Sequence, residues 1–186
     1  DQLGVGQFVL AGNSLGGQIA WGVALASPQR VRQLVLVDAA GYPLQSTSVP
    51  LGFRLARTPG LRNLMEFVLP RGVVDSSVRN VYGDPGRVTA ELVDRYYELT
   101  LRAGNRQALA YRLDQRLSGE EDTIRQLKQP TLILWGANDR LIPPETARRF
   151  AADIPGSKLV VLPGLGHVPH EEDPLTTVAI AKAFLD

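Results

Sequence analysis

The sequence predicts an α/β fold, in which a mostly parallel sheet is flanked by helices and interrupted by an inserted helical cap. Short apolar runs of strand length alternate with helical patterns at both ends of the chain, which is typical of a parallel sheet with helices on both faces. Between residues 42 and 125 no convincing strand occurs, and a structureless loop of that length is implausible in a compact domain. We therefore expect α/β core at residues 1–41 and 126–186, and a helical cap at 42–125.

Four apolar runs are the predicted strands of the sheet. They are residues 7–11, 34–37, 131–135 and 158–162. Continuous apolar runs of this length, without alternation, indicate strands that are covered on both faces. Gly12 is expected to interrupt the first strand, and Asp38 to close the second.

Helical patterns connect these strands and fill the cap. The core is expected to contain a helix that ends at Pro28, one that runs from Pro143 to about Ala152, and one over residues 174–185. The clearest helix of the cap covers residues 89–103, and Gly104 can serve as its C-terminal stop. Its shared apolar face carries Leu92, Tyr96 and Leu99.

Composition and charge exclude several classes of function. The chain has 186 residues, a net charge of +1 and no cysteine. The low charge argues against binding to nucleic acid or anionic lipid, and the lack of cysteine excludes disulfides, thiolate metal sites and a cysteine nucleophile. No apolar run approaches the roughly 20 residues of a membrane helix, and the N-terminus shows no charged-then-apolar signal. We expect no nucleic-acid partner, no membrane span and a cytoplasmic location.

The strongest chemical signal is the glycine-flanked Ser14 in Gly-Asn-Ser-Leu-Gly, which matches G-x-S-x-G. It lies between a predicted strand and a predicted helix, the setting of a nucleophile elbow, whereas a simple glycine-rich turn needs neither neighbour. A strained turn would expose the Ser14 hydroxyl beside a helix N-terminus, with the Leu15 N–H as one oxyanion donor. Side chains at Gly12 and Gly16 would clash, so glycine is expected to be required at both.

His167 is the predicted general base and Asp139 the predicted acid. A serine hydroxyl needs a base within hydrogen-bond reach, and His167 follows the last predicted strand, at the sheet edge where open α/β folds place their sites. His170 lies among proline and glutamate and is expected to be a surface or loop-packing residue. Asp139 ends the third predicted strand at the same edge and would fix the histidine tautomer. Asp38, which also ends a strand, is the rival acid.

With these positions assembled, the sequence resembles the α/β-hydrolase family, in particular its members with a helical cap. The matching motifs are residues 12–17, 134–143 and 166–174, and the order Ser, Asp, His is the family's chain order. The resemblance implies that no metal or organic cofactor is needed. It also implies that this chain is the C-terminal part of such a hydrolase, because family members have strands before the elbow and a loop there that supplies a second oxyanion donor. An exposed sheet edge would then favour a dimer.

The resemblance implies a serine hydrolase that cleaves carboxylic esters through an acyl-enzyme on Ser14. One alternative is a carbon–carbon bond hydrolase of ring-cleavage products, since the motif at residues 12–17 also resembles those enzymes. The other is a non-catalytic binding module, against which the complete Ser, Asp and His positions argue. Haloalkane dehalogenases and epoxide hydrolases are disfavoured, because they have Asp in place of the serine. The expected partner is therefore a small-molecule ester or ketone.

Overall fold

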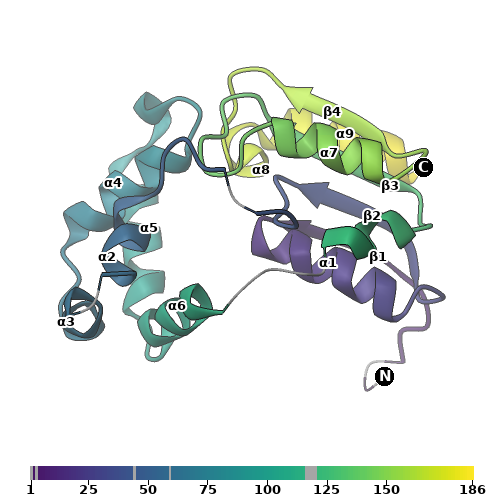
Figure 1. Ribbon diagram of the computed structural model, residues 1–186. Coiled ribbons are helices and arrows are strands. Elements are labelled where there is room, and N and C mark those ends of the chain that lie inside the picture. The colour runs from purple at the N-terminus through teal and green to yellow at the C-terminus, as the bar shows by residue number, and fades with distance from the viewer. Residues whose placement is uncertain (1, 3, 44, 59, 116–120) are drawn as a thin grey trace.

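A parallel sheet forms the core of the protein. The computed structural model describes residues 2, 4–43, 45–58, 60–115 and 121–186. Within these residues the sheet has four strands in chain order, β1 (Phe8–Asn13), β2 (Val31–Val37), β3 (Thr131–Gly136) and β4 (Lys158–Leu162). Every pairing is parallel, which confirms the predicted α/β class. The carboxyl ends of the strands point toward the cap (Figure 1).

Helices cover both faces of this sheet. On one face lie α1 (Leu15–Ala26) and α7 (Glu145–Asp153), and on the other lies α9 (Pro174–Leu185) (Figure 1). The alternation of side chains along β2 divides its residues between the two layers. Leu34 and Leu36 pack with α1 and α7, whereas Val35 and Val37 pack with α9.

The central strands are more buried than the edge strands. Every residue of β3 is buried, as its continuous apolar run predicts. In β1 the side chains are half-buried and Ala11 is exposed. Phe8 and Leu10 pack against the cluster that contains α1, and Val9 packs against the cluster that contains α9, so both faces of the first strand are covered as expected, but only in part.

Short helices, which we call the cap after the expectation for this region, lie beside the carboxyl ends of the strands (Figure 1). They are α2 (Leu51–Ala56), α3 (Leu61–Phe67), α4 (Arg71–Val81), α5 (Ala90–Leu101) and α6 (Asn105–Asp114), with a 3-10 turn, η1, at Pro85–Arg87. Their shared apolar cluster includes Val74, Val78 and Val93, and Val168 of the core joins it. Residues 44, 59 and 116–120 of the expected cap, and residues 1 and 3 of the expected core, lie outside the described residues.

Some boundaries differ from those expected. The 3-10 turn η2 (Glu121–Gln126) was expected mostly in the cap, but its Ile124 belongs to the core cluster with α1 and α7. Gly12 does not interrupt the first strand, because Gly12 and Asn13 continue the pairing of β1 with β2. Gly104 has a left-handed φ of 84°, but it directly precedes α6, whereas α5 already ends at Leu101.

A four-residue helix, α8 (Pro169–Glu172), follows the β4 loop and was not predicted from the sequence. Among the described residues, no helix has both the length and the apolar character that crossing a membrane requires.

Candidate active site

Ser14 lies on a sharp turn between β1 and α1. Its φ of 54° and ψ of −117° are rare for a residue with a side chain and mark a strained turn. The Ser14 N–H donates to the Val37 carbonyl (3.0 Å), and the Ser14 carbonyl accepts from the Ala40 N–H (2.9 Å). Both partners belong to the end of β2 and the loop after it, so the neighbouring strand holds the turn in place.

Close packing at this turn requires glycine at Gly12 and Gly17. A Cβ on Gly12 would lie 2.1 Å from the Gly16 carbonyl oxygen, and a Cβ on Gly17 would lie 2.4 Å from the Cβ of Ala39. At Gly16 nothing lies within 4 Å of the Cβ position. The expectation for Gly16 is therefore wrong: this residue contributes its carbonyl to the tight contact, while its own Cα faces open space.

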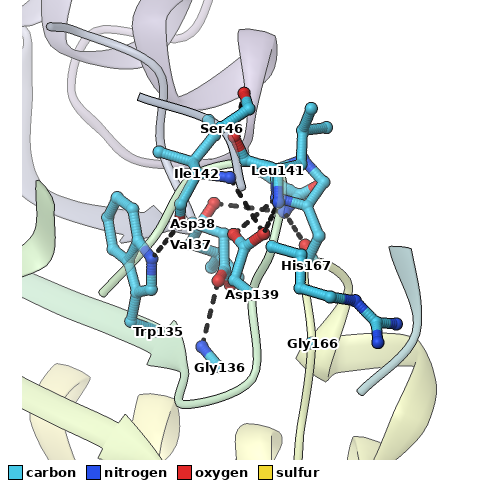
Figure 2. Close-up of polar contacts among 12 residues, drawn as sticks. Val37, Asp38, Ser46, Trp135, Gly136, Asp139, Leu141, Ile142, Gly166 and His167 are labelled. Carbon is cyan, nitrogen blue, oxygen red and sulfur yellow. Dashed lines mark hydrogen bonds and ion pairs between the residues drawn. The ribbon is translucent and has the colours of Figure 1, made fainter. Parts of the chain in front are cut away.

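The predicted base and acid are in direct contact. His167 Nδ1 lies 2.7 Å from Asp139 Oδ2, and both side chains are buried (Figure 2). The other carboxylate oxygen of Asp139 accepts the N–H groups of Leu141 (2.8 Å) and Ile142 (3.0 Å). With Nδ1 engaged by the carboxylate, Nε2 is the nitrogen that remains to accept a proton from a nucleophile.

Two buried indoles hold the loops that follow β2 and β3. The Trp21 Nε1–H donates to the Ala40 carbonyl (2.9 Å). In the same way, the Trp135 Nε1–H donates to the Ile142 carbonyl (2.9 Å) (Figure 2). The Ala40 N–H also donates to the Ser14 carbonyl, and the Ile142 N–H donates to Asp139. The two indoles therefore hold the loop beside Ser14 and the loop beside Asp139.

Asn13 ties the serine turn to the histidine loop. Its Nδ2 donates to the carbonyl of His167 (2.9 Å) and to that of Val37 (3.1 Å). Among the described residues, no hydrogen bond joins the Ser14 hydroxyl to the His167 ring. Catalytic hydrogen bonds in enzymes without substrate are often long and shorten when substrate binds.

Asp38, the rival acid, lies in the same cluster. A carboxylate oxygen of Asp38, one of Asp139 and a ring nitrogen of His167 lie within 4.8 Å of one another. Burial raises the pKa of Asp38 well above its usual range, and the negative charge of Asp139 raises it further. These three side chains are of types that bind metals, but the facing atoms of Asp139 and His167 are hydrogen-bonded to each other. The cluster is therefore not an open set of ligands.

Glu172 fastens the histidine loop to the cap, and no sequence pattern identified it. Its two carboxylate oxygens accept the N–H groups of Gly166 (2.7 Å) and Gly83 (2.9 Å). The His167 N–H itself donates to the Val81 carbonyl at the end of α4 (2.8 Å). His167 thus lies where the core and the cap meet.

Arg140, next to the acid, makes a second tie to the cap. Its guanidinium donates to the carbonyls of Asn80 (3.1 Å) and Tyr82 (2.7 Å) at the end of α4. A cation at a helix C-terminus binds carbonyls that lack intrahelical partners. The position after Asp139 therefore has a structural role that the motif alone did not reveal. His170, in contrast, is exposed, as expected.

A pocket of about 200 Å³ opens onto Ser14 between the core and the cap. Leu15, the predicted oxyanion donor, also lines it and is the first residue of α1, where backbone N–H groups have no intrahelical partner. The cap contributes the side chains of Phe53, Arg57, Leu109, Arg112 and neighbouring Gln115. Leu109 also lines a second cavity of about 210 Å³ inside the cap.

The chain is similar to known proteins over most of its length. The family described as "alpha/beta hydrolase fold" matches residues 1–174. The chain is 32% identical to 2-hydroxymuconate semialdehyde hydrolase of Pseudomonas putida, a match that covers 100% of the chain and 64% of that protein. It is 30% identical to Lipase 1 of Psychrobacter immobilis, covering 94% of the chain and 54% of the lipase.

Among solved structures, the meta-cleavage product hydrolase of Pseudomonas fluorescens IP01 matches with a TM-score of 0.82 and 24% identity. This match covers 98% of the chain and 66% of that hydrolase, and at this identity it bears on the fold alone. The chain thus spans less than two thirds of the length of each of these relatives.

Proposed function

The chain belongs to the α/β-hydrolase fold family, and we propose that it is a hydrolase that cleaves carboxylic esters through an acyl-enzyme on Ser14. One observation carries the proposal. Ser14 lies on a strained turn and lines a pocket, while Asn13 joins that turn to a buried His167–Asp139 pair. A weak hydroxyl nucleophile needs this combination of exposure, a nearby base and a carboxylate that orients the base.

The chemistry follows from these positions. His167 Nε2 takes the Ser14 proton as the hydroxyl oxygen attacks the ester carbonyl, and the developing oxyanion accepts the Leu15 N–H. Asp139 stabilises the imidazolium without taking its proton. His167 then protonates the leaving alcohol as the carbon–oxygen bond breaks. Water, activated by the same base, attacks the acyl-enzyme and releases the acid.

A second candidate substrate is a ring-cleavage ketone that carries a free carboxylate. Arg57 and Arg112 both line the Ser14 pocket, and a guanidinium suits a carboxylate because it can donate two parallel hydrogen bonds. Arg112 already donates to the Gln18 side chain (3.0 Å), which holds it at the pocket wall. The Pseudomonas putida relative is named a 2-hydroxymuconate semialdehyde hydrolase. In this case His167 would protonate the departing carbon.

Covalent labelling tests the nucleophile. We expect a fluorophosphonate to add once to the folded protein, as measured by intact mass, and to add nothing to S14A. The matched control is S76A, which removes an exposed hydroxyl on α4 and should still form the adduct. A folded wild-type protein that forms no adduct would instead support the non-catalytic binding module.

Parallel assays of neutral esters and anionic ring-cleavage ketones separate the two substrate classes. If the ketone is the substrate, R112A should raise its KM about 10–100-fold, because a hydrogen bond to a charged group is lost. The KM of R112A for a neutral p-nitrophenyl ester should change less than about threefold, because this substrate carries no carboxylate. R148A, an exposed arginine on α7 outside the pocket, is the control. Turnover of esters without turnover of ketones favours the ester proposal.

A further inference from the structure

Asp38 takes no part in the proposed reaction at Ser14, although it is fully buried behind the acid and the base. Its Oδ1 accepts the Gly136 N–H (3.0 Å) (Figure 2). Its Oδ2 is buried and has no hydrogen-bond donor among the described residues. A buried carboxylate oxygen without a donor is costly, whereas a protonated oxygen becomes a donor itself and needs only an acceptor.

The ionisable groups that face Asp38 are Asp139, His167 and, at longer range, Glu172. Two of these groups, Asp139 and Glu172, are acidic. Asp38 and Asp139 are both buried and close together, and such carboxyl groups cannot both hold a full negative charge, so one of these two retains a proton. Burial raises the pKa of Asp38 well above its usual range, with further increases from the charge of Asp139 and from hydrogen bonding to it.

The hydrogen bonds decide which carboxyl of the pair is the neutral one. Asp139 accepts two backbone N–H groups at one oxygen, and its other oxygen lies 2.7 Å from His167 Nδ1, so both of its oxygens already have hydrogen-bond partners. Asp38 accepts a single N–H. Its φ of 43° lies in a region where Asp and Asn are the side chains best tolerated, so the site suits either residue.

We propose that Asp38 is a neutral carboxylic acid whose Oδ2–H donates to the Asp139 carboxylate, which makes Asp38 a positioning residue for the His167–Asp139 pair. The role rests on the proposed hydrolase function, whereas the protonation state does not. The proton stays on Asp38 throughout turnover. Asp139 thereby gains a further hydrogen bond, and His167 faces one negative charge in place of two.

Infrared difference spectroscopy reads the protonation state directly. The spectrum of wild type minus D38N at pH 7 should contain the C=O stretching band of a protonated carboxyl group. D173N is the matched control: hydrogen bonds from Thr176 lower the pKa of Asp173, so its difference spectrum should contain carboxylate bands only. A D38N spectrum with carboxylate bands alone overturns the proposal, whether or not the protein hydrolyses any ester.

Kinetics test the positioning role. In D38N the amide can accept the Gly136 N–H and donate to Asp139, so kcat/KM should stay within about threefold and the acid limb of its pH profile within about 0.3 pH units. D38A removes the donor and should lower kcat about tenfold, with the activity restored in D38N. If D38N instead moves the acid limb down by a pH unit or more, Asp38 is a carboxylate that supports the imidazolium, and the proposal is wrong.

Discussion

The core and the cap line the same pocket but hold their side chains in different ways. In the core, His167 and Asp139 are buried, and hydrogen bonds from backbone and indole groups fix the loops that carry them. The cap contributes Leu109 and Arg112 of α6 and Arg57, which follows α2, and its α3 leaves Phe67 81% exposed. Under the proposed function, the geometry for bond cleavage therefore belongs to the core, and the side chains of the cap select what fits beside Ser14.

The largest loss of activity is expected from a substitution of the nucleophile in the core. S14A removes the nucleophile and should lower kcat/KM for a p-nitrophenyl ester by about 10⁵–10⁶-fold, since knocking out one member of such a unit removes nearly all of its catalysis. The steady-state hydrolysis rate measures this, with S76A of the cap as the unaffected control. A S14A protein that retains more than about one hundredth of the activity would place the chemistry elsewhere.

The two glycines after the serine turn, Gly16 and Gly17, should differ in their effect on the free energy of unfolding. G17A places a Cβ 2.4 Å from the Cβ of Ala39 and should lower the free energy of unfolding by about 1–3 kcal/mol. G16A meets open space and lies in the first turn of α1, so it should be neutral or stabilising by up to about 1 kcal/mol. Urea unfolding midpoints compare the two. Equal destabilisation by both variants would contradict the packing described for this turn.

A substitution at Leu109 tests whether the cap sets the acyl-chain preference. Leu109 lines both the Ser14 pocket and the cavity inside the cap. L109A should join the two spaces and shift the preference among p-nitrophenyl esters about tenfold toward longer acyl chains. L99A alters only the cap cavity and serves as the control. The fluorophosphonate reaction of L109A should stay within about threefold of wild type. A loss of reaction with every acyl chain would mean that this cap residue supports the chemistry itself.

A pH series compares the stability contributed by a carboxyl group of the core with that contributed by one of the cap. The folded state raises the pKa of Asp38. Its proton therefore contributes its whole share to the free energy of unfolding below the unfolded pKa of about 3.9, and this contribution is lost as pH rises through the folded pKa. While Asp38 is protonated only in the folded state, wild type loses about 1.4 kcal/mol of stability per pH unit, whereas D38N has no proton to lose. The advantage of D38N in Tm over wild type should therefore widen by about 8–16 °C from pH 4 to pH 8.

The matched cap variant for this comparison is D75N, which removes a partly exposed ion pair with Arg79. Its Tm difference from wild type should stay within about 1–2 °C over the same pH range, since such pairs contribute little. Calorimetry at each pH measures both differences. A D38N difference that narrows with increasing pH would show that the core carboxyl is ionised in the folded state.

The sequence allowed the α/β class and the positions of Ser14, Asp139 and His167 to be predicted, for one physical reason. Each of these residues follows a strand of a parallel sheet, and the carboxyl ends of such strands meet at one edge. Local patterns therefore predicted one sheet edge for three distant residues. The structure brings His167 and Asp139 into contact, and Asn13 joins the Ser14 turn to the His167 backbone. They also identified Asp38 as a rival, since it ends a strand in the same way.

Features that depend on contacts between distant residues could not be predicted. Gly17 is required because it meets Ala39 of the neighbouring strand's loop, and nothing in the serine motif indicates that neighbour. Glu172 binds the Gly83 N–H, 89 residues away in the cap. The protonation of Asp38 likewise follows from its burial beside Asp139, which only the folded structure shows.

The most direct test of the account is to trap the acyl-enzyme. The protein is quenched in acid during turnover of p-nitrophenyl acetate, digested, and its peptides are sequenced by mass spectrometry. The account predicts a single acetyl group on Ser14, on the peptide that joins β1 to α1, and none in S14A. Acetylation of another residue, or turnover without any acyl group on Ser14, would contradict it.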